Sequence, residues 1–301
     1  MTVVVFGSIN RDLVMRVPRL PLAGETVAAT SYDLLPGGKG ANQAVAAARQ
    51  GVPTVMLGAV GHDAHGDAML AALAQAGVGT GAIARLPGPT GLAHVFVSDE
   101  GENQIVIVGG ANAALPAPDV FPAGAAIAVA QAEVPTAAVA RFLALAHEVG
   151  ARTLYNAAPA LAEGRAILPL ADIVVVNETE LAFFLGEAVP EGDTALAAAA
   201  RRLMAREGQW VIVTLGGAGV IAEGPGGTVR LPARAVPVVD TTGAGDTFCG
   251  VLAARLAQGE SMAQSLAVAV FAAGLSVQRL GAAASMPTRA EVDAGLALLD
   301  H

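Results

Sequence analysis

Apolar residues follow two different rhythms along this chain. Apolar and polar positions alternate over about 12–36 and 90–108, which predicts half-exposed antiparallel strands. From Ala125 onward, short β-branched runs alternate with longer segments of helical period. Strands that alternate with helices indicate a mainly parallel sheet with helices on both faces. The pattern therefore predicts a single α/β domain over 1–301, with the two alternating segments forming a small β lid.

The predicted core elements are short strands and amphipathic helices. Strands are expected at 2–7, 52–58, 125–130, 153–156, 173–176 and 210–215, and a further strand is expected to carry Asp240 into the turn at Gly243. Helices are expected from Gly37 to about Gln50 and at 65–75, 136–149, 178–185 and 194–206, and the chain beyond Gly243 is expected to be mostly helical.

Composition narrows the class of protein. Apolar residues make up 54% and charged residues 14% of 301 residues, so the chain can bury a large core. A net charge of −9 argues against nucleic acid and anionic membranes as partners. The one cysteine, Cys249, excludes an internal disulfide and a cysteine-based zinc site. The sequence shows no export signal, and the longest uncharged run contains polar residues, so a cytoplasmic protein is expected.

A Gly-rich turn between an apolar run and an apolar helix is the most informative stretch. It reads Val-Val-Asp-Thr-Thr-Gly-Ala-Gly-Asp-Thr-Phe over 238–248. Gly243 and Gly245 allow backbone geometry that a Cβ would forbid, so N–H groups at the helix start can point at one anion. Asp246 would then lie beside that anion, as the base for a hydroxyl that attacks a phosphate. The alternative is that Asp246 only caps the helix.

The second candidate motif contains the only lysine of the chain. Gly-Gly-Lys-Gly-Ala-Asn-Gln over 37–43 opens a predicted helix, and Lys39 stands in a chain that otherwise uses arginine. Backbone amides, the ammonium of Lys39 and the amide of Asn42 could converge on a polyhydroxylated or anionic ligand. The spacing of a Walker A loop is absent. The alternative is a flexible turn that carries one exposed lysine.

Other polar residues follow strands and are weaker signals individually. Asn177 and Glu180 could organise Mg²⁺ and phosphates, or could form an ordinary capping box. The Gly-rich run 214–219 could admit a nucleotide, although a hairpin turn into 220–222 is the favoured explanation of this run by itself. Glu133 follows the strand at 125–130. Because strand ends and helix starts of a parallel sheet share one edge, all these groups are expected to meet there.

Taken together, these motifs resemble the ribokinase (PfkB) family of sugar kinases. Gly-Gly-Lys-Gly-Ala-Asn-Gln-Ala at 37–44 resembles the N-terminal signature of the family, and Asp-Thr-Thr-Gly-Ala-Gly-Asp-Thr-Phe at 240–248 resembles the C-terminal one. Asn177-x-x-Glu180 matches the Mg²⁺-associated motif of the family, and the order of motifs matches over nearly the whole chain. The resemblance implies a three-layer ribokinase-like core with a small β lid.

The resemblance also implies a role for each matching residue. It implies that sugar hydroxyls contact Asn10, Asp12, Gly38, Lys39, Asn42 and Glu133, that Asp246 is the base, and that Gly243, Ala244 and Gly245 form an anion hole. It places ATP against Asn177, Thr214, Leu215, Gly216, Gly217, Ala218, Gly219 and Gly245, with Mg²⁺ near Glu180 through water. It places K⁺ or a similar monovalent cation near Asp240, Thr242, Ser276, Arg279, Gly281 and Ser285.

The activity implied by the resemblance is ATP-dependent phosphorylation of the 5-hydroxyl of D-ribose, in a homodimer joined through the lid. Fructose, 2-keto-3-deoxygluconate or a nucleoside remain alternative substrates, and a sugar-binding regulator without turnover is the alternative of another class. Val270 departs from the family pattern, because relatives often carry Asn or His there, near the nucleotide base.

Overall fold

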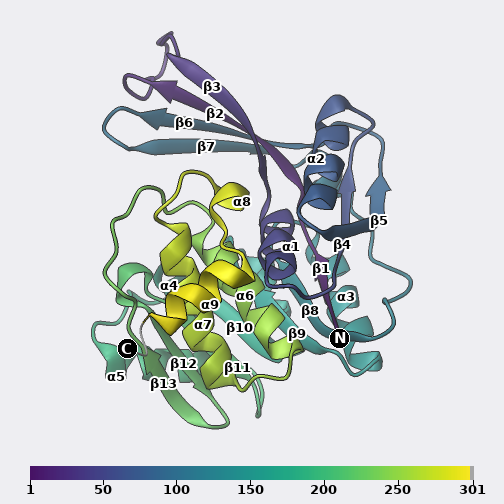
Figure 1. Ribbon diagram of the computed structural model, residues 1–301, viewed down its shortest axis with the longest axis vertical. Helices are drawn as coiled ribbons and strands as arrows, with labels where there is room; N and C mark the ends of the chain where they lie inside the picture. The colour runs from purple at the N-terminus through teal and green to yellow at the C-terminus, as the bar shows by residue number, and fades with distance from the viewer. Residues whose placement is uncertain (299–301) are drawn as a thin grey trace.

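The computed structural model describes residues 1–298, and its core is a nine-stranded sheet (Figure 1). The strand order is β13-β12-β11-β10-β9-β8-β1-β4-β5. The strands are β1 (Thr2–Phe6), β4 (Thr54–Val60), β5 (Val78–Arg85), β8 (Ala125–Gln131), β9 (Arg152–Asn156), β10 (Ile173–Asn177), β11 (Trp210–Thr214), β12 (Val220–Gly224) and β13 (Gly227–Leu231). Pairing is parallel from β5 to β11, whereas the β11–β12 and β12–β13 pairs are antiparallel.

Helices cover both faces of this sheet because successive strand residues point to opposite sides. One face packs against α1 (Lys39–Arg49), α2 (Ala64–Gln75), α6 (Ala244–Ala257), α7 (Met262–Ser276), α8 (Ala282–Ser285) and α9 (Arg289–Ala297), and the other against α3 (Thr136–Glu148), α4 (Glu178–Leu185) and α5 (Asp193–Leu203). In β1, Val3 and Val5 belong to the first core and Val4 and Phe6 to the second. The predicted three-layer α/β core is confirmed.

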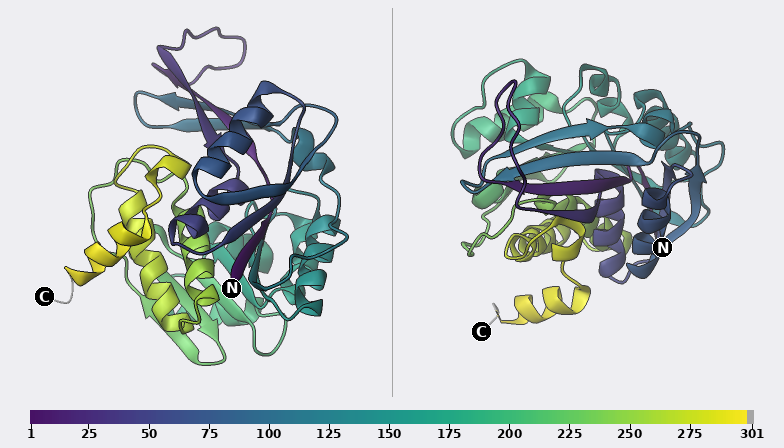
Figure 2. Two further views of the ribbon diagram at one scale, coloured as in Figure 1. Left: turned by 45° about the vertical axis from the view of Figure 1, so that its right-hand side comes forward. Right: turned by 90° about the horizontal axis from the view of Figure 1, so that it is seen from above.

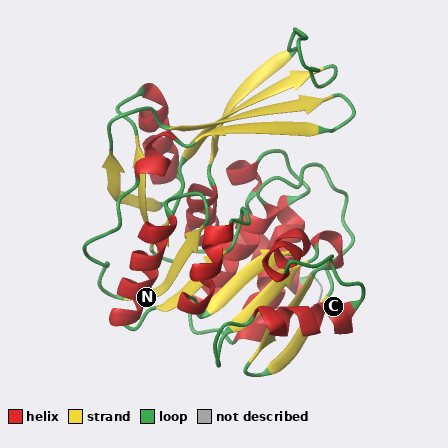
Figure 3. Cartoon of the chain, turned by 180° about the vertical axis from the view of Figure 1, so that it is seen from behind, coloured by secondary structure: helices red, strands yellow, loops and turns green. Residues whose placement is uncertain are grey.

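A second sheet of four strands stands apart from the core. It has the order β3-β2-β6-β7 and consists of β2 (Asn10–Val17), β3 (Ser31–Gly37), β6 (Gly91–Ser98) and β7 (Asn103–Val108). Figure 3 shows it projecting beyond the helices, and the view from above in Figure 2 shows it spread over one end of the core. The alternating segments that were expected to form a lid supply these strands.

Two sequence-based expectations about strands were incomplete or wrong. Strands β5 and β13 were not expected, because glycines interrupt the alternation in β5 and β13 is a short return strand. The run before the Gly-rich turn, on which a strand was expected to carry Asp240, forms no strand within residues 1–298. Val238 and Val239 are 64% and 56% exposed there. Pro232 and Pro237 remove backbone donors that a strand would need, which explains the irregular path.

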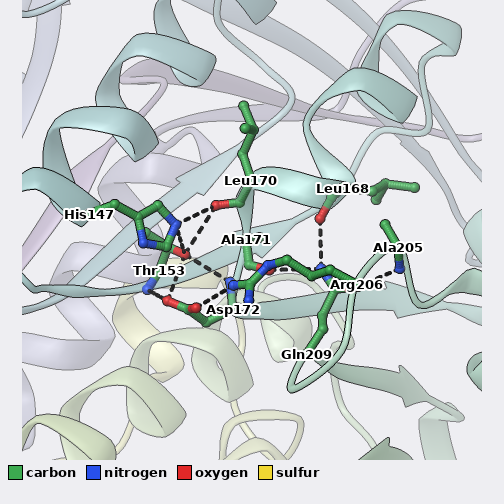
Figure 4. Close-up of polar contacts among 9 residues, drawn as sticks. All are labelled: His147, Thr153, Leu168, Leu170, Ala171, Asp172, Ala205, Arg206 and Gln209. Atoms are coloured by element: carbon green, nitrogen blue, oxygen red, sulfur yellow. Dashed lines mark hydrogen bonds and ion pairs between the residues drawn. The ribbon is translucent and has the colours of Figure 1, made fainter.

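Polar side chains at the amino-terminal ends of β9, β10 and β11 bond to one another (Figure 4). The buried Gln209 amide donates to Leu168 O at 2.6 Å and Ala171 O at 2.7 Å, and its oxygen accepts from Ala205 N at 2.8 Å. Asp172 accepts from Thr153 and pairs with Arg206. Because partners within the fold use these groups, this edge is structural, and the opposite edge is left for ligands.

Close backbone contacts fix α1 at the carboxyl edge of the sheet. A Cβ on Gly40 would lie 2.7 Å from the carbonyl carbon of Gly7, and a Cβ on Gly250 would lie 2.5 Å from the carbonyl oxygen of Gln43. Only glycine allows β1, α1 and α6 to approach so closely. Among the helices of residues 1–298, none combines the length and apolar character needed to cross a bilayer.

Candidate active site

Some of the polar residues expected at the carboxyl edge of the sheet line one cavity there, whereas Asn10, Asp12, Asn42 and Glu133 lie outside its lining. A cavity of about 250 Å³ opens between the ends of β9, β10 and β11 and the start of α6. Its polar lining comprises Lys39, Asn156, Asn177, Glu180, Thr214, Thr241 and Asp246, with Gly243 and Gly245 on the same wall. Residues that lie far apart in the sequence therefore form one chamber, as expected of a ligand site in a parallel α/β fold.

The Gly-rich turn begins α6 in the geometry that its glycines suggested. Gly243 is the N-cap residue with a φ of 77°, and a Cβ there would lie 2.9 Å from the Cα of Ala282. A Cβ on Gly245 would meet no atom within 4 Å, so the backbone at that residue is open to the cavity. The N–H of Ala244 donates to Thr241 O at 3.2 Å. The helix therefore presents its positive end to the chamber.

Asp246 is buried, and side chains of α1 hold both of its carboxylate oxygens. Asn42 Nδ2 donates to Oδ2 at 3.0 Å, and Gln43 Nε2 donates to Oδ1 at 2.9 Å. Only 6% of Asp246 is exposed. Since the N-cap of α6 is Gly243 and no side chain caps that helix, the alternative that Asp246 is a helix cap is wrong. The carboxylate instead faces α1 and the cavity.

A second polar cluster lies near Asp246, at the start of strand β2 of the four-stranded sheet. Glu133 accepts hydrogen bonds from Ser8 Oγ and from the backbone N–H of Lys39. The buried Asn112 donates to Asn10 Oδ1 at 2.7 Å and fixes that side chain. Asp12 Oδ1 and Asn42 Oδ1 are buried without a partner in the described chain. Buried acceptors of this kind are costly unless a ligand donates to them, so the cluster fits a ligand rich in hydroxyl groups.

The charges in this cluster act on one another strongly. Burial, followed by the neighbouring charges of Glu133 and Asp246, raises the pKa of Asp12 to about 7. Asp246 makes the largest contribution to raising the pKa of Lys39, against the opposing effect of burial. The ammonium of the only lysine therefore remains charged beside several carboxylates. Lys39 is half-buried and lines the cavity, so it is not the exposed lysine of the alternative interpretation.

The nucleotide-side residues fall into two groups. Asn177 and Glu180 form the capping box that was the simpler interpretation, and both also line the cavity. Burial raises the pKa of Glu180 despite the hydrogen bond from Asn177 N. Thr214 lines the cavity, whereas Leu215, Gly216, Gly217, Ala218 and Gly219 form the turn of the β11–β12 hairpin just beyond it. The hairpin interpretation of this run is thus correct.

The residues matched to a monovalent-cation site surround a loop beneath the Gly-rich turn. Asp240 accepts hydrogen bonds from Thr242 N at 2.9 Å and Gly281 N at 2.8 Å. Burial opposes the shift, but the Thr242 side chain, followed by these two N–H groups, lowers the pKa of Asp240. Ser276 and Ser285 are buried and donate to nearby carbonyls. Arg279 is exposed and pairs with Glu291. Val270 packs against the core from α7.

Four residues of the site were missed as candidates. Gln43 contacts Asp246 directly, Gln131 and Asn156 contact Gln43, and Asn112 contacts Asn10. Gln131 and Asn156 end strands β8 and β9, so the rule that pointed to Asn177 also applies to them. Among residues 1–298, no group of three His, Cys, Asp or Glu side chains is placed to hold a metal by itself.

Known proteins resemble this chain over its whole length. The sequence profile of the pfkB family carbohydrate kinases matches residues 1–289. A Haemophilus influenzae ribokinase is 36% identical, with 100% of this chain and 99% of that protein covered. A Salmonella typhi deoxyribokinase is 35% identical, with 96% of each covered. The structure of Arabidopsis thaliana ribokinase complexed with ribose and ATP superposes with a TM-score of 0.89 at 33% identity, covering 97% of both chains.

The region matched by the family profile includes all the residues that line the cavity. The matched region contains the Lys39 motif, the strand ends and the turn before Asp246. A profile that covers nearly the whole chain, together with relatives above 30% identity, identifies the family. The chain belongs to the pfkB family of carbohydrate kinases.

Proposed function

We propose that this protein transfers the γ-phosphoryl group of ATP to the 5-hydroxyl of D-ribose, giving D-ribose 5-phosphate and ADP. The observation that carries the proposal is the buried Asp246, held by two amides between a helix N-terminus and a cluster of unpartnered acceptors. One carboxylate therefore adjoins both an anion site and a hydroxyl site. The ribokinase titles of the relatives support the choice of D-ribose.

The proposed reaction is an in-line displacement. The 5-hydroxyl oxygen forms a bond to the γ-phosphorus, the bond from that phosphorus to the β–γ bridging oxygen breaks, and ADP leaves with that electron pair. The hydroxyl proton passes to Asp246. The N-terminus of α6, with Gly243, Ala244 and Gly245, offers donors to the transferring phosphate. The N–H of Ala244 exchanges its hydrogen bond to Thr241 O for one to the phosphate. The remaining hydroxyls are held by Asn10, Asp12, Gly38, Lys39, Asn42 and Glu133.

On the nucleotide side, we infer that ATP lies against the end of β11. The cavity at Thr214 and the glycine turn 216–219 beyond it support this position. A single carboxylate at the chamber wall fits Mg²⁺, which keeps most of its waters and binds phosphate oxygens, so Glu180 would hold the ion through water. When bound, the ion neutralises charge on the phosphates. Because Val270 stands where relatives often carry Asn or His, we expect the base selectivity of the nucleotide site to differ from theirs.

Water must be kept from the phosphate, because otherwise ATP is hydrolysed. We infer that the sheet β3-β2-β6-β7 is the lid that does so. Asp12 and Asn10 lie at the start of β2, so a bound sugar would contact both the lid and the core.

The alternatives to the phosphorylation of D-ribose are another sugar or a nucleoside as substrate, or sugar binding without turnover.

Asp246→Asn tests the base directly. Without a proton acceptor at this position, kcat with D-ribose should fall by about 10²–10⁴, while the sugar dissociation constant changes less. A coupled ADP-release assay with D-ribose, 2-deoxyribose, fructose, 2-keto-3-deoxygluconate and adenosine measures both the drop and the substrate choice. Preference for another sugar would overturn the ribose assignment. Near-normal kcat in the folded variant would overturn the role of Asp246.

The raised pKa of Asp12 predicts a pH-dependent affinity for sugar. Its carboxyl is protonated in the free protein below about pH 7 and ionised above it. Since a carboxylate accepts stronger hydrogen bonds from hydroxyls, the KM for D-ribose should fall as pH rises from 6 to 8. Asp12→Asn should have a high KM with no such slope, and Asp33→Asn, at an exposed position on β3, should behave as wild type. A flat wild-type profile would contradict this role.

We further propose activation by K⁺ or a similar monovalent cation at the Asp240 loop. Asp240 joins the turn at Thr242 to Gly281 through its two oxygens, each of which retains further acceptor capacity. A cation there would fix the turn before α6 and so aim its N–H groups. Rates in K⁺ should exceed those in Na⁺ at equal ionic strength, and Asp240→Ala should remove the difference. Equal wild-type rates in both salts would rule out the site.

A homodimer joined through the lid is the assembly we propose. The edge strand β7 exposes Ile105, Val106 and Ile107 to 55%, 59% and 55%, and apolar sheet edges are normally covered. Ile107→Lys should therefore convert a dimer to a monomer in sedimentation velocity. Val120→Lys, at an exposed position outside the sheet, is the control and should leave the dimer intact. A wild-type monomer at micromolar concentration would refute this assembly.

A further inference from the structure

A chain of buried amides connects the sheet to the carboxylate of Asp246. Gln131 ends β8 and Asn156 ends β9, and these two residues are cross-strand partners in register. Gln43 reaches them from α1. Its oxygen accepts from Gln131 Nε2 at 2.7 Å, and its nitrogen donates to Asn156 Oδ1 at 3.0 Å and to Asp246 Oδ1 at 2.9 Å. Gln43 and Gln131 are completely buried.

The charge of Asp246 determines the direction of every amide in this chain. An ionised carboxylate only accepts hydrogen bonds, so Gln43 must turn its NH₂ group towards Asp246. Its oxygen then faces Gln131, which must donate. Both hydrogens of Gln43 Nε2 are used, one by Asp246 and one by Asn156. Gln131 Oε1 is left against Gly7, and it has no hydrogen-bond partner in the part of the chain described.

This arrangement exceeds what packing requires. A buried acceptor without a partner, such as Gln131 Oε1, costs free energy. An apolar side chain at position 43 would fill the same space, but it would give Asp246 no hydrogen-bond donor. We propose that Gln43 is a positioning residue that anchors the Asp246 carboxylate to the carboxyl ends of β8 and β9 and holds it in the orientation that receives the proton of the sugar. The role rests on the proposed function only for its effect on turnover.

Removing the donor has a defined electrostatic consequence. Hydrogen bonds to a carboxylate favour its charged form, so losing one raises its pKa. The ionisable groups facing Asp246 are Lys39 on α1, Asp12 on β2 and Cys249 one turn along α6. These stay in place when Gln43 is changed. A change in the titration of Asp246 can therefore be assigned to the lost amide.

The decisive experiment compares Gln43→Met with Gln50→Met in the full-length protein. Gln50 caps the same helix, is equally buried, and bonds to Pro287 O and Arg255 at the end of α1 away from the cavity. Carboxyl-carbon NMR of protein labelled at aspartate follows Asp246, whose signal is identified by its loss in Asp246→Asn. Gln43→Met should move the titration of this signal to higher pH, because a hydrogen bond to the charged form is lost, whereas Gln50→Met should leave it unchanged.

Kinetics provide the second measurement. In Gln43→Met the acid limb of the kcat profile with D-ribose should move to higher pH by the same shift, and kcat should fall about tenfold, with little change in sugar KM. Gln43→Glu keeps the shape of the side chain but sets a second carboxyl against Asp246, so it should be worse than Met. Gln131→Met should lower kcat less than Gln43→Met, and should add nothing further once Gln43 is Met.

The outcomes separate this inference from the proposed function. If Asp246 titrates at the same pH in Gln43→Met and in Gln50→Met, the positioning role is overturned, whatever the activity of the two variants. A raised sugar KM without a change in kcat would make Gln43 a sugar ligand, which also overturns it. Absence of wild-type turnover with any sugar, combined with a raised Asp246 pKa in Gln43→Met, would overturn the kinase proposal and support the amide chain.

Discussion

The burial of one carboxylate between two helices is the constraint on which the rest of the site depends. Asp246 is 6% exposed, and an ionised group taken out of water costs several kcal/mol unless donors replace the water. Asn42 and Gln43 supply those donors from successive positions of α1, each hydrogen bond contributing roughly 1.5–3 kcal/mol because its acceptor is charged. The close contact of Gly250 with α1 brings α6 near enough for both.

The carboxylates near Asp246 act strongly on Lys39 and on Asp12. Asp246, Glu133 and Glu180 all raise the pKa of Lys39, and Glu133 and Asp246 raise that of Asp12. The chamber therefore carries an excess of negative charge that a single ammonium only partly balances. Such a site is costly for the empty protein, and hydroxyl donors or cations that enter it relieve the cost.

The two edges of the core sheet illustrate how polar groups divide between stability and ligand binding. At the amino-terminal edge, Gln209 uses both its donors and its acceptor within the fold. At the carboxyl edge, Asp12 and Asn42 each keep a buried oxygen that has no partner among residues 1–298. The residue types are similar in both places, and the two clusters differ in whether partners within the fold satisfy their hydrogen bonds.

Local sequence determined much of this protein. Period-two and helical patterns located most elements of the core and the second sheet, because burial on a strand or a helix face repeats at a fixed spacing. Glycines at 243 and 245, the lone Lys39 and the polar strand ends located most of the site, since those residue types are needed where a backbone approaches an anion. Proline positions could also have indicated that 232–239 is irregular.

Tertiary structure alone decided how these groups pair. Nothing local to Gln43 shows that its amide lies between Gln131, Asn156 and Asp246, which come from two strands and a helix far along the chain. Likewise, only the folded structure shows that Asp246 is not a helix cap, because its hydrogen-bond donors lie on α1. A hydrogen bond depends on distance in space, and the distance between segments far apart in sequence is set by the packing of the whole core.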